Sequence, residues 1–222
     1  MSAPLLPQTF WFRLSVPCRR LDALPRSKGR MLDLPESCRL PQTALLDGRD
    51  AWADVRLAWN PKGLAVAVEV TGKTGRIRHL PDRPEVSDGV DLWIDTRDTR
   101  NVHRATRFCH RLRASIIPQG REKTLDVAVA PLKIHRAQAD APLASPDLFQ
   151  AAAEQLKAGW RLELFLPAET LNGFDPETNR RLGFAYQVTD PGRGDQFLGV
   201  GREFPVAEDP SLWSTLELRD DA

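Results

Sequence analysis

A polar face built around one tryptophan is the clearest chemical feature of this sequence. Within residues 90–95, Asp91, Trp93 and Asp95 alternate with aliphatic residues. A β-strand with this pattern turns the aliphatic residues to one face and these three residues to the other. An aromatic plate flanked by carboxylates suits a sugar ring, which stacks on the indole while its hydroxyls bond to the acids. The same alternation is also typical of an ordinary strand whose second face is half buried.

Strand-forming segments must position this face, and they recur along the whole chain. Residues 53–59 and 64–70 carry alternating apolar residues on either side of an Asn60-Pro-Lys-Gly63 turn, which predicts a β-hairpin. The chain has 18 prolines and 14 glycines, which are scattered as expected for short strands joined by turns. The sequence predicts further strands at residues 10–16, 31–34, 90–94, 108–117, 124–130, 160–166, 182–188 and 213–218.

Residues 145–156 are open to two interpretations. Ser145 in an N-cap position, Pro146 and the alanine run after them are typical of a helix. Residues 157–159, followed by the alternating pattern from Trp160, instead indicate a turn between two strands.

Composition excludes several classes of function. Lys and Arg number 31 against 30 Asp and Glu, so no net charge favours nucleic acid or an anionic membrane. No apolar run approaches the roughly 20 residues of a membrane span. The first residues lack the basic start and the apolar stretch of a signal peptide. The sequence as given therefore predicts a cytoplasmic protein, or an extracellular one if the true start lies upstream.

The cysteines and most tryptophans are expected to be buried. Cys18, Cys38 and Cys109 are odd in number and form no C-x-x-C pair, which favours free thiols, with a Cys18–Cys38 disulfide as the alternative. Four tryptophans lie beside turns or on apolar faces and are predicted to be core residues. They are Trp52, Trp59, Trp160 and Trp213.

Five segments follow one another in a distinctive order. They are residues 55–64, 87–95, 159–167, 182–190 and 209–216. Together they resemble the family 9 carbohydrate-binding modules and the related DOMON-like sandwiches, over about residues 45–218. The resemblance implies an all-β fold, a two-sheet antiparallel β-sandwich of jelly-roll type with few short helices, and it makes residues 148–166 a hairpin. We expect one domain over residues 1–222, in which residues 1–44 form an N-terminal extension packed onto it.

The resemblance also implies a ligand face, from which this chain departs at two positions. Sugar-binding members of the family clamp a saccharide end between two tryptophans, and Glu85 and Ala207 stand at those positions here. Polar positions match better, because Asp91 corresponds to an acid and Gln187 to a glutamine. Trp93 is then the expected platform for a sugar. The predicted ligand-binding residues are Asp91, Trp93, Gln187 and Asp95.

Structural calcium is the cofactor that the acidic residues around the predicted strand suggest. Asp88, Asp91, Asp95 and Asp98 offer the hard oxygen ligands that Ca²⁺ prefers. Arginines interleaved among them, such as Arg97, favour ion pairing instead.

A zinc site is a weaker interpretation of the neighbouring histidines and cysteine. Cys109 and His110 are adjacent on a predicted strand and point to opposite faces, which leaves too few ligands for a tetrahedral site. Together with the acidic residues, the weak metal candidates are Asp88, Asp98, His103, Cys109 and His110.

No catalytic motif stands out in the sequence. The chain has no G-x-S-x-G, H-E-x-x-H, P-loop or G-x-G-x-x-G pattern. Asp91 and Asp95 would lie about 13 Å apart along a strand, too far for a glycosidase pair. The sequence thus predicts a non-catalytic module that binds a saccharide on a strand face. The alternatives are a cytoplasmic structural or protein-interaction domain without sugar binding, and a metal-dependent enzyme that uses His103, Cys109 and His110.

Overall fold

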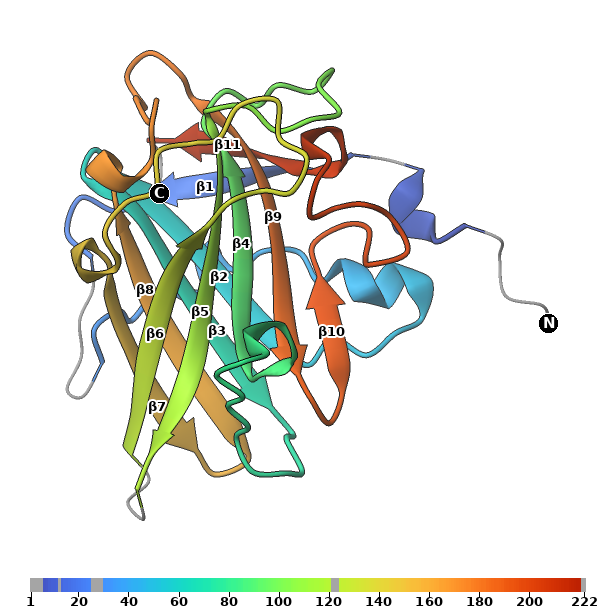
Figure 1. Cartoon of the computed structure of the whole chain (residues 1–222), viewed down its shortest axis with the longest axis vertical. Coiled ribbons are helices and arrows are strands. Elements are labelled where there is room, and N and C mark those ends of the chain that lie inside the picture. The colour runs from blue at the N-terminus through green and yellow to red at the C-terminus, as the bar shows by residue number, and fades with distance from the viewer. Residues whose placement is uncertain (1–5, 12, 25–29, 121–123, 221–222) are drawn as a thin grey trace.

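Eleven strands and seven short 3-10 helices make up the described part of the chain (Figure 1). The computed structural model describes residues 6–11, 13–24, 30–120 and 124–220. The strands are β1 (Ser15–Arg20), β2 (Ala53–Asn60), β3 (Gly63–Thr71), β4 (Gly89–Asp95), β5 (Cys109–Gln119), β6 (Thr124–Leu132), β7 (Gln150–Leu156), β8 (Gly159–Pro167), β9 (Arg181–Asp190), β10 (Gly194–Phe197) and β11 (Ser214–Arg219). The helices are η1 (Gln8–Phe10), η2 (Glu36–Cys38), η3 (Thr43–Asp47), η4 (Pro84–Val86), η5 (Pro146–Leu148), η6 (Ala168–Thr170) and η7 (Pro210–Leu212).

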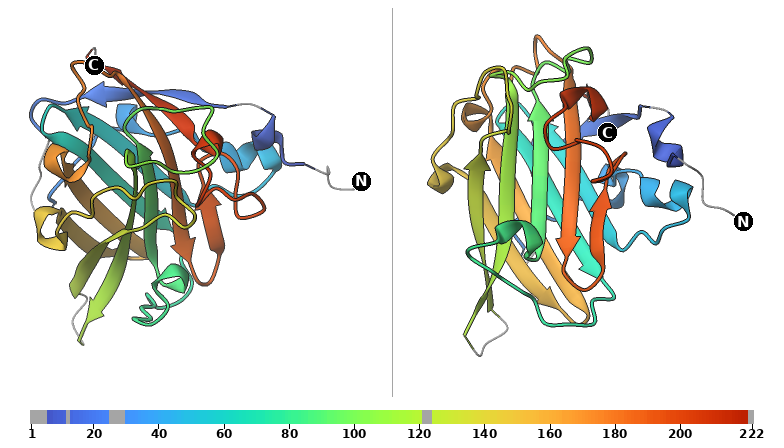
Figure 2. Two further views of the ribbon diagram at one scale, coloured as in Figure 1. Left: turned by 45° about the horizontal axis from the view of Figure 1, so that its top comes forward. Right: turned by 45° about the vertical axis from the view of Figure 1, so that its right-hand side comes forward.

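The strands form one sheet that closes on itself. Its order is β9-β11-β1-β2-β3-β8-β7-β6-β5-β4, the pairing of β4 with β9 completes the ring, and β10 pairs with the end of β9. Two of the strand pairings are short: β6 and β7 share one residue pair, and β1 and β2 share two. The ring is flattened into two layers, with β2, β3, β7 and β8 in one and the other strands opposite (Figure 2). The predicted all-β sandwich is confirmed.

Strand β1 differs from the expected antiparallel arrangement, because it runs parallel to both β11 and β2. The sequence predicts a strand at residues 10–16 that stops at Pro17, whereas β1 runs through this proline. Leu21 N donates to Trp59 O, so the odd-numbered residues of this segment turn their N–H groups toward β2. Pairing with β2 begins only at Arg19, so the missing N–H of Pro17 costs no hydrogen bond between strands.

The two hairpins expected from the sequence are both present. Strands β2 and β3 pair from Ala53↔Val70 to Asn60↔Gly63, and β7 and β8 pair from Gln150↔Phe165 to Leu156↔Gly159. The second pairing settles the contested segment: its alanine run is a strand, since pairing with β8 overrides local helix propensity.

The main core lies between the two layers. Every strand except β10 contributes alternate residues to it, and it includes the buried ring of Trp160 and the three predicted strand residues Val90, Leu92 and Ile94. The four tryptophans predicted as core residues are buried, and Cys18, Cys38 and Cys109 are free buried thiols, as expected.

Two sequence predictions about strands need correction. Residues 31–34 form no strand; Leu32 and Leu34 instead pack on the outer face of β2 and β3 beside Cys38. Strand β10 was not predicted, because the turn expected after Asp190 continues directly into it. No helix among the described residues is long and apolar enough to cross a membrane.

Candidate functional site

The polar face of β4 is formed as the alternation predicted, but it is covered. Asp91, Trp93 and Asp95 point away from the main core, and all seven residues of β4 are nevertheless buried. Side chains of β5, β9 and the loops near them cover this outer face of the sheet.

Asp91 is held between two arginines of β5. Arg113 lies directly opposite Asp91, and its Nη1 donates to Asp91 Oδ2 at 2.6 Å. Arg111 donates through Nη2 to Oδ1 at 3.0 Å. Arg113 also donates from Nη2 to Ser87 O at 2.6 Å and from Nε to Ser115 Oγ at 3.3 Å. The buried carboxylate is therefore paired, which compensates for its loss of hydration.

Gln187 lies on the other side of Asp91, as the predicted site requires. The two residues are register partners across β4 and β9. Gln187 Nε2 donates to Asp195 Oδ1 at 3.0 Å and to Thr189 Oγ1 at 3.1 Å, and Asp195 forms an ion pair with Arg202. We call Asp91, Arg111, Arg113, Gln187 and Asp195 the outer-face polar group.

Trp93 is on the same face, but its ring is only 1% exposed. The Arg111 guanidinium lies 5.5 Å from its ring centroid, and its Nε1 has no hydrogen-bond partner in the described part of the chain. Its ring belongs to a second apolar cluster that includes Ala105, Cys109, Ile134, Ala185, Phe197, Val200, Val206 and Trp213. A platform for a sugar needs an exposed ring face, and Trp93 has none in this structure.

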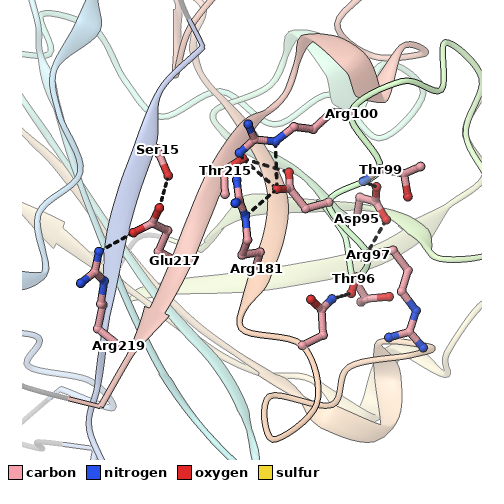
Figure 3. A network of polar contacts seen from close by, with 12 residues as sticks. Ser15, Asp95, Thr96, Arg97, Thr99, Arg100, Arg181, Thr215, Glu217 and Arg219 are labelled. Carbon is pink, nitrogen blue, oxygen red and sulfur yellow. Dashed lines mark hydrogen bonds and ion pairs between the residues drawn. The ribbon is translucent and has the colours of Figure 1, made fainter.

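Asp95 closes the turn that follows β4. Its Oδ1 accepts from Arg97 N at 2.9 Å and its Oδ2 accepts from Thr99 N at 2.6 Å (Figure 3). A side-chain carboxylate that accepts backbone N–H groups just downstream is a common way to stabilise a turn. Asp95 is separated from the outer-face polar group by Trp93 and serves this turn.

The four aspartates considered for calcium are all engaged by protein donors. Asp88 accepts from Lys73 Nζ and Trp160 Nε1, and Asp98 accepts from the Thr215 hydroxyl and pairs with Arg100 and Arg181. Asp91 and Asp95 accept from the groups described above. These carboxylates are arranged around N–H and O–H donors, so the residues do not fit a calcium site.

The zinc candidates have different hydrogen-bond partners. His103 Nδ1 lies 3.1 Å from Asp209 Oδ2, whereas His110 Nε2 lies 3.4 Å from Asn172 O. Burial raises the pKa of the Cys109 thiol to about 11, so the thiol stays protonated at neutral pH. No group of three metal-ligating side chains occurs within residues 6–11, 13–24, 30–120 and 124–220.

The two positions that match the family's clamping tryptophans contribute no rings in this chain. Glu85 is exposed in η4, and Ala207 is partly buried against the cluster around Trp93. The sequence analysis missed the two arginines of the site. Arg111 and Arg113 are two residues apart on a predicted strand, and this spacing places both guanidiniums on one face.

The fold has close counterparts among solved structures. One is a family 9 carbohydrate-binding module from Caldicellulosiruptor kristjanssonii in complex with cellotriose, 15% identical, which covers 94% of this chain and 95% of that one with a TM-score of 0.63. Another family 9 module from the same organism, in complex with glucose, is 17% identical and covers 77% of this chain and 78% of that one with a TM-score of 0.54.

The sequence comparisons add no family assignment. No protein-family model matches the chain, and no curated protein matches it. The DOMON-like part of the expected resemblance stays a prediction. What the structural likeness establishes is the fold, and this chain has the fold of the family 9 carbohydrate-binding modules.

Proposed function

We propose that this chain is a non-catalytic saccharide-binding module whose ligand lies over the outer-face polar group. One observation carries the proposal. Asp91, with Arg111 on one side and Gln187 on the other, forms a fixed row of hydrogen-bonding groups across three adjacent strands. The fold that presents this row is that of modules whose solved structures hold cellotriose and glucose.

Arg111 is the residue best placed to contact a ligand. Its side chain is 25% exposed, against 3% for Arg113. Its Nε and Nη2 bond to Asp91 and its guanidinium lies over Trp93, so Nη1 is left to donate to a sugar hydroxyl. Because Asp91 holds the guanidinium in place, little side-chain entropy is lost when a ligand binds. In this arrangement Asp91 positions Arg111.

The affinity for a neutral sugar is expected to be low. Glu85 and Ala207 supply no ring, and Trp93 is covered, so a ligand gains hydrogen bonds without aromatic stacking. A dissociation constant near 1 mM, or about −4 kcal/mol, is a reasonable expectation for such a site.

Titration followed by NMR tests the proposal at this affinity. The ¹⁵N-labelled protein is titrated with glucose and cellotriose while backbone amides and the Gln187 side-chain amide are observed. We expect saturable shifts confined to β4, β5 and β9, and Arg111→Ala should raise Kd about tenfold, or roughly 1.4 kcal/mol. Arg180→Ala is the matched control, because Arg180 also pairs with an aspartate, Asp220, and lies over a tryptophan, Trp59.

A flat response would overturn the proposal, and so would an equal loss of affinity in both variants. The burial of Trp93 favours the alternative in that case, a structural or protein-interaction domain that retains the fold without binding sugar.

A further inference from the structure

A cleft of about 580 Å³ lies at the end of the sheet where the β3–β4 loop, the end of β5 and the β9–β10 turn meet. These segments come together at the lower end of the molecule in Figure 1. The cleft is separate from the outer-face polar group, since no residue of that group lines it. Its lining residues are Lys73, Thr74, Gly75, Arg76, Ile77, Arg78, His79, Ile117, Pro118, Pro191 and Gly192.

The lining of this cleft is basic. It includes two arginines, a lysine and a histidine, and no acidic residue. Arg76 and Arg78 are exposed, and neither guanidinium has an ion pair or hydrogen bond within the part of the chain that the structure describes. Two unpaired guanidiniums facing one concave surface create a positive potential that attracts an oxyanion.

A buried ion cluster holds the loop that carries these arginines. Lys73 Nζ lies 2.8 Å from Asp88 Oδ1 and 2.9 Å from Asp190 Oδ1, and all three side chains are at most 5% exposed. Arg78 N donates to Asp88 Oδ2 at 2.7 Å. The backbone of the loop is thus fixed on both sides of Arg76, so little backbone entropy is lost when a ligand binds there.

Two polar atoms in or directly behind the lining of this cleft lack partners in the described part of the chain. They are His79 Nδ1 and Asp190 Oδ2, and both are buried. His79 lines the cleft, and Asp190 lies behind the lining, where its Oδ1 accepts from Lys73 Nζ and Gly192 N. Buried polar atoms without partners call for a hydroxyl or a water molecule. Ile117, Pro118 and Pro191 add an apolar wall suited to the C–H face of a sugar ring.

We propose that this cleft binds a saccharide that bears an oxyanion, either a carboxylate or a sulfate group. Arg76 and Arg78 bind the oxyanion, and a hydroxyl, directly or through a water molecule, satisfies His79 Nδ1. The inference rests on the proposed function in taking a sugar as the ligand class. It assigns that ligand to a second surface, and the two are tested by different probes and different variants.

The test compares charged and neutral ligands on the ¹⁵N-labelled full chain. Tetragalacturonate carries carboxylates, a heparin tetrasaccharide carries sulfates, cellotetraose is the neutral control and sodium sulfate is the control for a free oxyanion. We expect at least one acidic oligosaccharide to shift the Gly75 and Gly192 amide resonances saturably. Its binding should be weaker in about 0.5 M salt, because salt at that concentration screens the attraction between the arginines and the oxyanion. Cellotetraose and sodium sulfate should leave both amides nearly unchanged.

Variants place the site. Arg76→Ala/Arg78→Ala should raise Kd for the acidic ligand at least about tenfold. Arg83→Ala is the matched control, because Arg83 is exposed in the same loop, its side chain has no partner among the described residues, and it does not line the cleft. Arg111→Ala should not change binding of the acidic ligand.

Several results would overturn the inference. They are no binding of either acidic ligand, equal weakening by Arg83→Ala, or sulfate alone binding as tightly as the oligosaccharides. Failure of the proposed function has a different signature, namely no response of the Gln187 side-chain amide to cellotriose, whatever happens at Gly75 and Gly192.

Discussion

The outer-face polar group and the cleft at the β3–β4 loop both contain arginines, but the arginines differ in whether they are paired with a carboxylate. On the outer face, Arg111 and Arg113 share the single carboxylate of Asp91, so both guanidiniums are paired within the protein. At the cleft, Lys73 takes up the charge of the aspartates, while Arg76 and Arg78 on the rim are not paired in the described part of the chain. The difference separates arginines whose positions are fixed by a carboxylate, Arg111 included, from arginines whose charge is left for an anionic ligand.

Burial explains why the pairing differs. An ion removed from water must be paired and hydrogen-bonded, or its loss of hydration is not offset. Arg113 and Lys73 are both nearly inaccessible, at 3% and 5% side-chain exposure, and both have carboxylate partners. The rim arginines keep their hydration, so the fold places no demand on their pairing.

The largest effect is expected when Lys73 is replaced. Lys73→Met leaves Asp88 and Asp190 side by side, buried and without their cation, so the free energy of unfolding should fall by about 3–5 kcal/mol. Urea denaturation followed by tryptophan fluorescence measures the change. Lys62→Met, at an exposed lysine, is the control and should lie within about 0.5 kcal/mol of wild type.

A second variant separates charge from packing. Lys73→Met/Asp190→Asn removes one of the two carboxylates left without a cation. It should recover at least about 1 kcal/mol of the free energy of unfolding lost in Lys73→Met. A loss below about 1 kcal/mol for Lys73→Met alone would show that the buried cluster does not hold the loop as argued.

A smaller effect is expected for the outer face, where Asp91 has two cations. Arg113→Met removes one ion pair and the donor to Ser87 O, but Arg111 remains, so we expect a loss of about 2–3 kcal/mol. Arg76→Met, measured by the same urea denaturation, should change stability by less than about 0.5 kcal/mol. Equal losses of stability in the two variants would contradict the claim that Arg113 stabilises the fold and Arg76 does not.

The strand pattern was readable from the sequence because burial has a period of two residues. The alternation at 53–59, 64–70 and 90–94 sets which side chains face the core, and the structure places Val90, Leu92 and Ile94 there. The family resemblance assigned Asp91 and Gln187 to one site, but their register across β4 and β9 was not readable from spacing, because the two residues lie far apart along the chain.

The cover over β4 and the cleft at the β3–β4 loop could not be predicted in the same way. Trp93 is buried by residues of distant loops, such as Ile134 and Val206, whose path no local pattern specifies. The loop that lines the cleft is held by Asp88 and Asp190, which are 102 residues apart along the chain and bind the same lysine, Lys73. Alternation shows which face a residue takes, but not what covers that face.

His110 extends the comparison to a buried titratable group that has no carboxylate partner among the described residues. Desolvation lowers the pKa of its imidazole below its ordinary value of 6.5, only partly opposed by the hydrogen bond to Asn172 O. Well above pH 6.5 the ring is neutral in both the folded and the unfolded chain, so no stability is lost there. As the pH falls below that value, the unfolded chain takes up a proton that the folded chain resists, and stability declines.

A comparison of pH dependence isolates this contribution. Between pH 7.5 and 5, the urea midpoint of wild type should fall more than that of His110→Gln, because carboxylates elsewhere titrate equally in both proteins and cancel in the difference. Parallel pH profiles would mean that His110 finds a charge partner on protonation. It would then behave like Lys73 and Arg113, which are buried together with a carboxylate of opposite charge. The interpretation of His110 as a buried group without a charge partner would then be wrong.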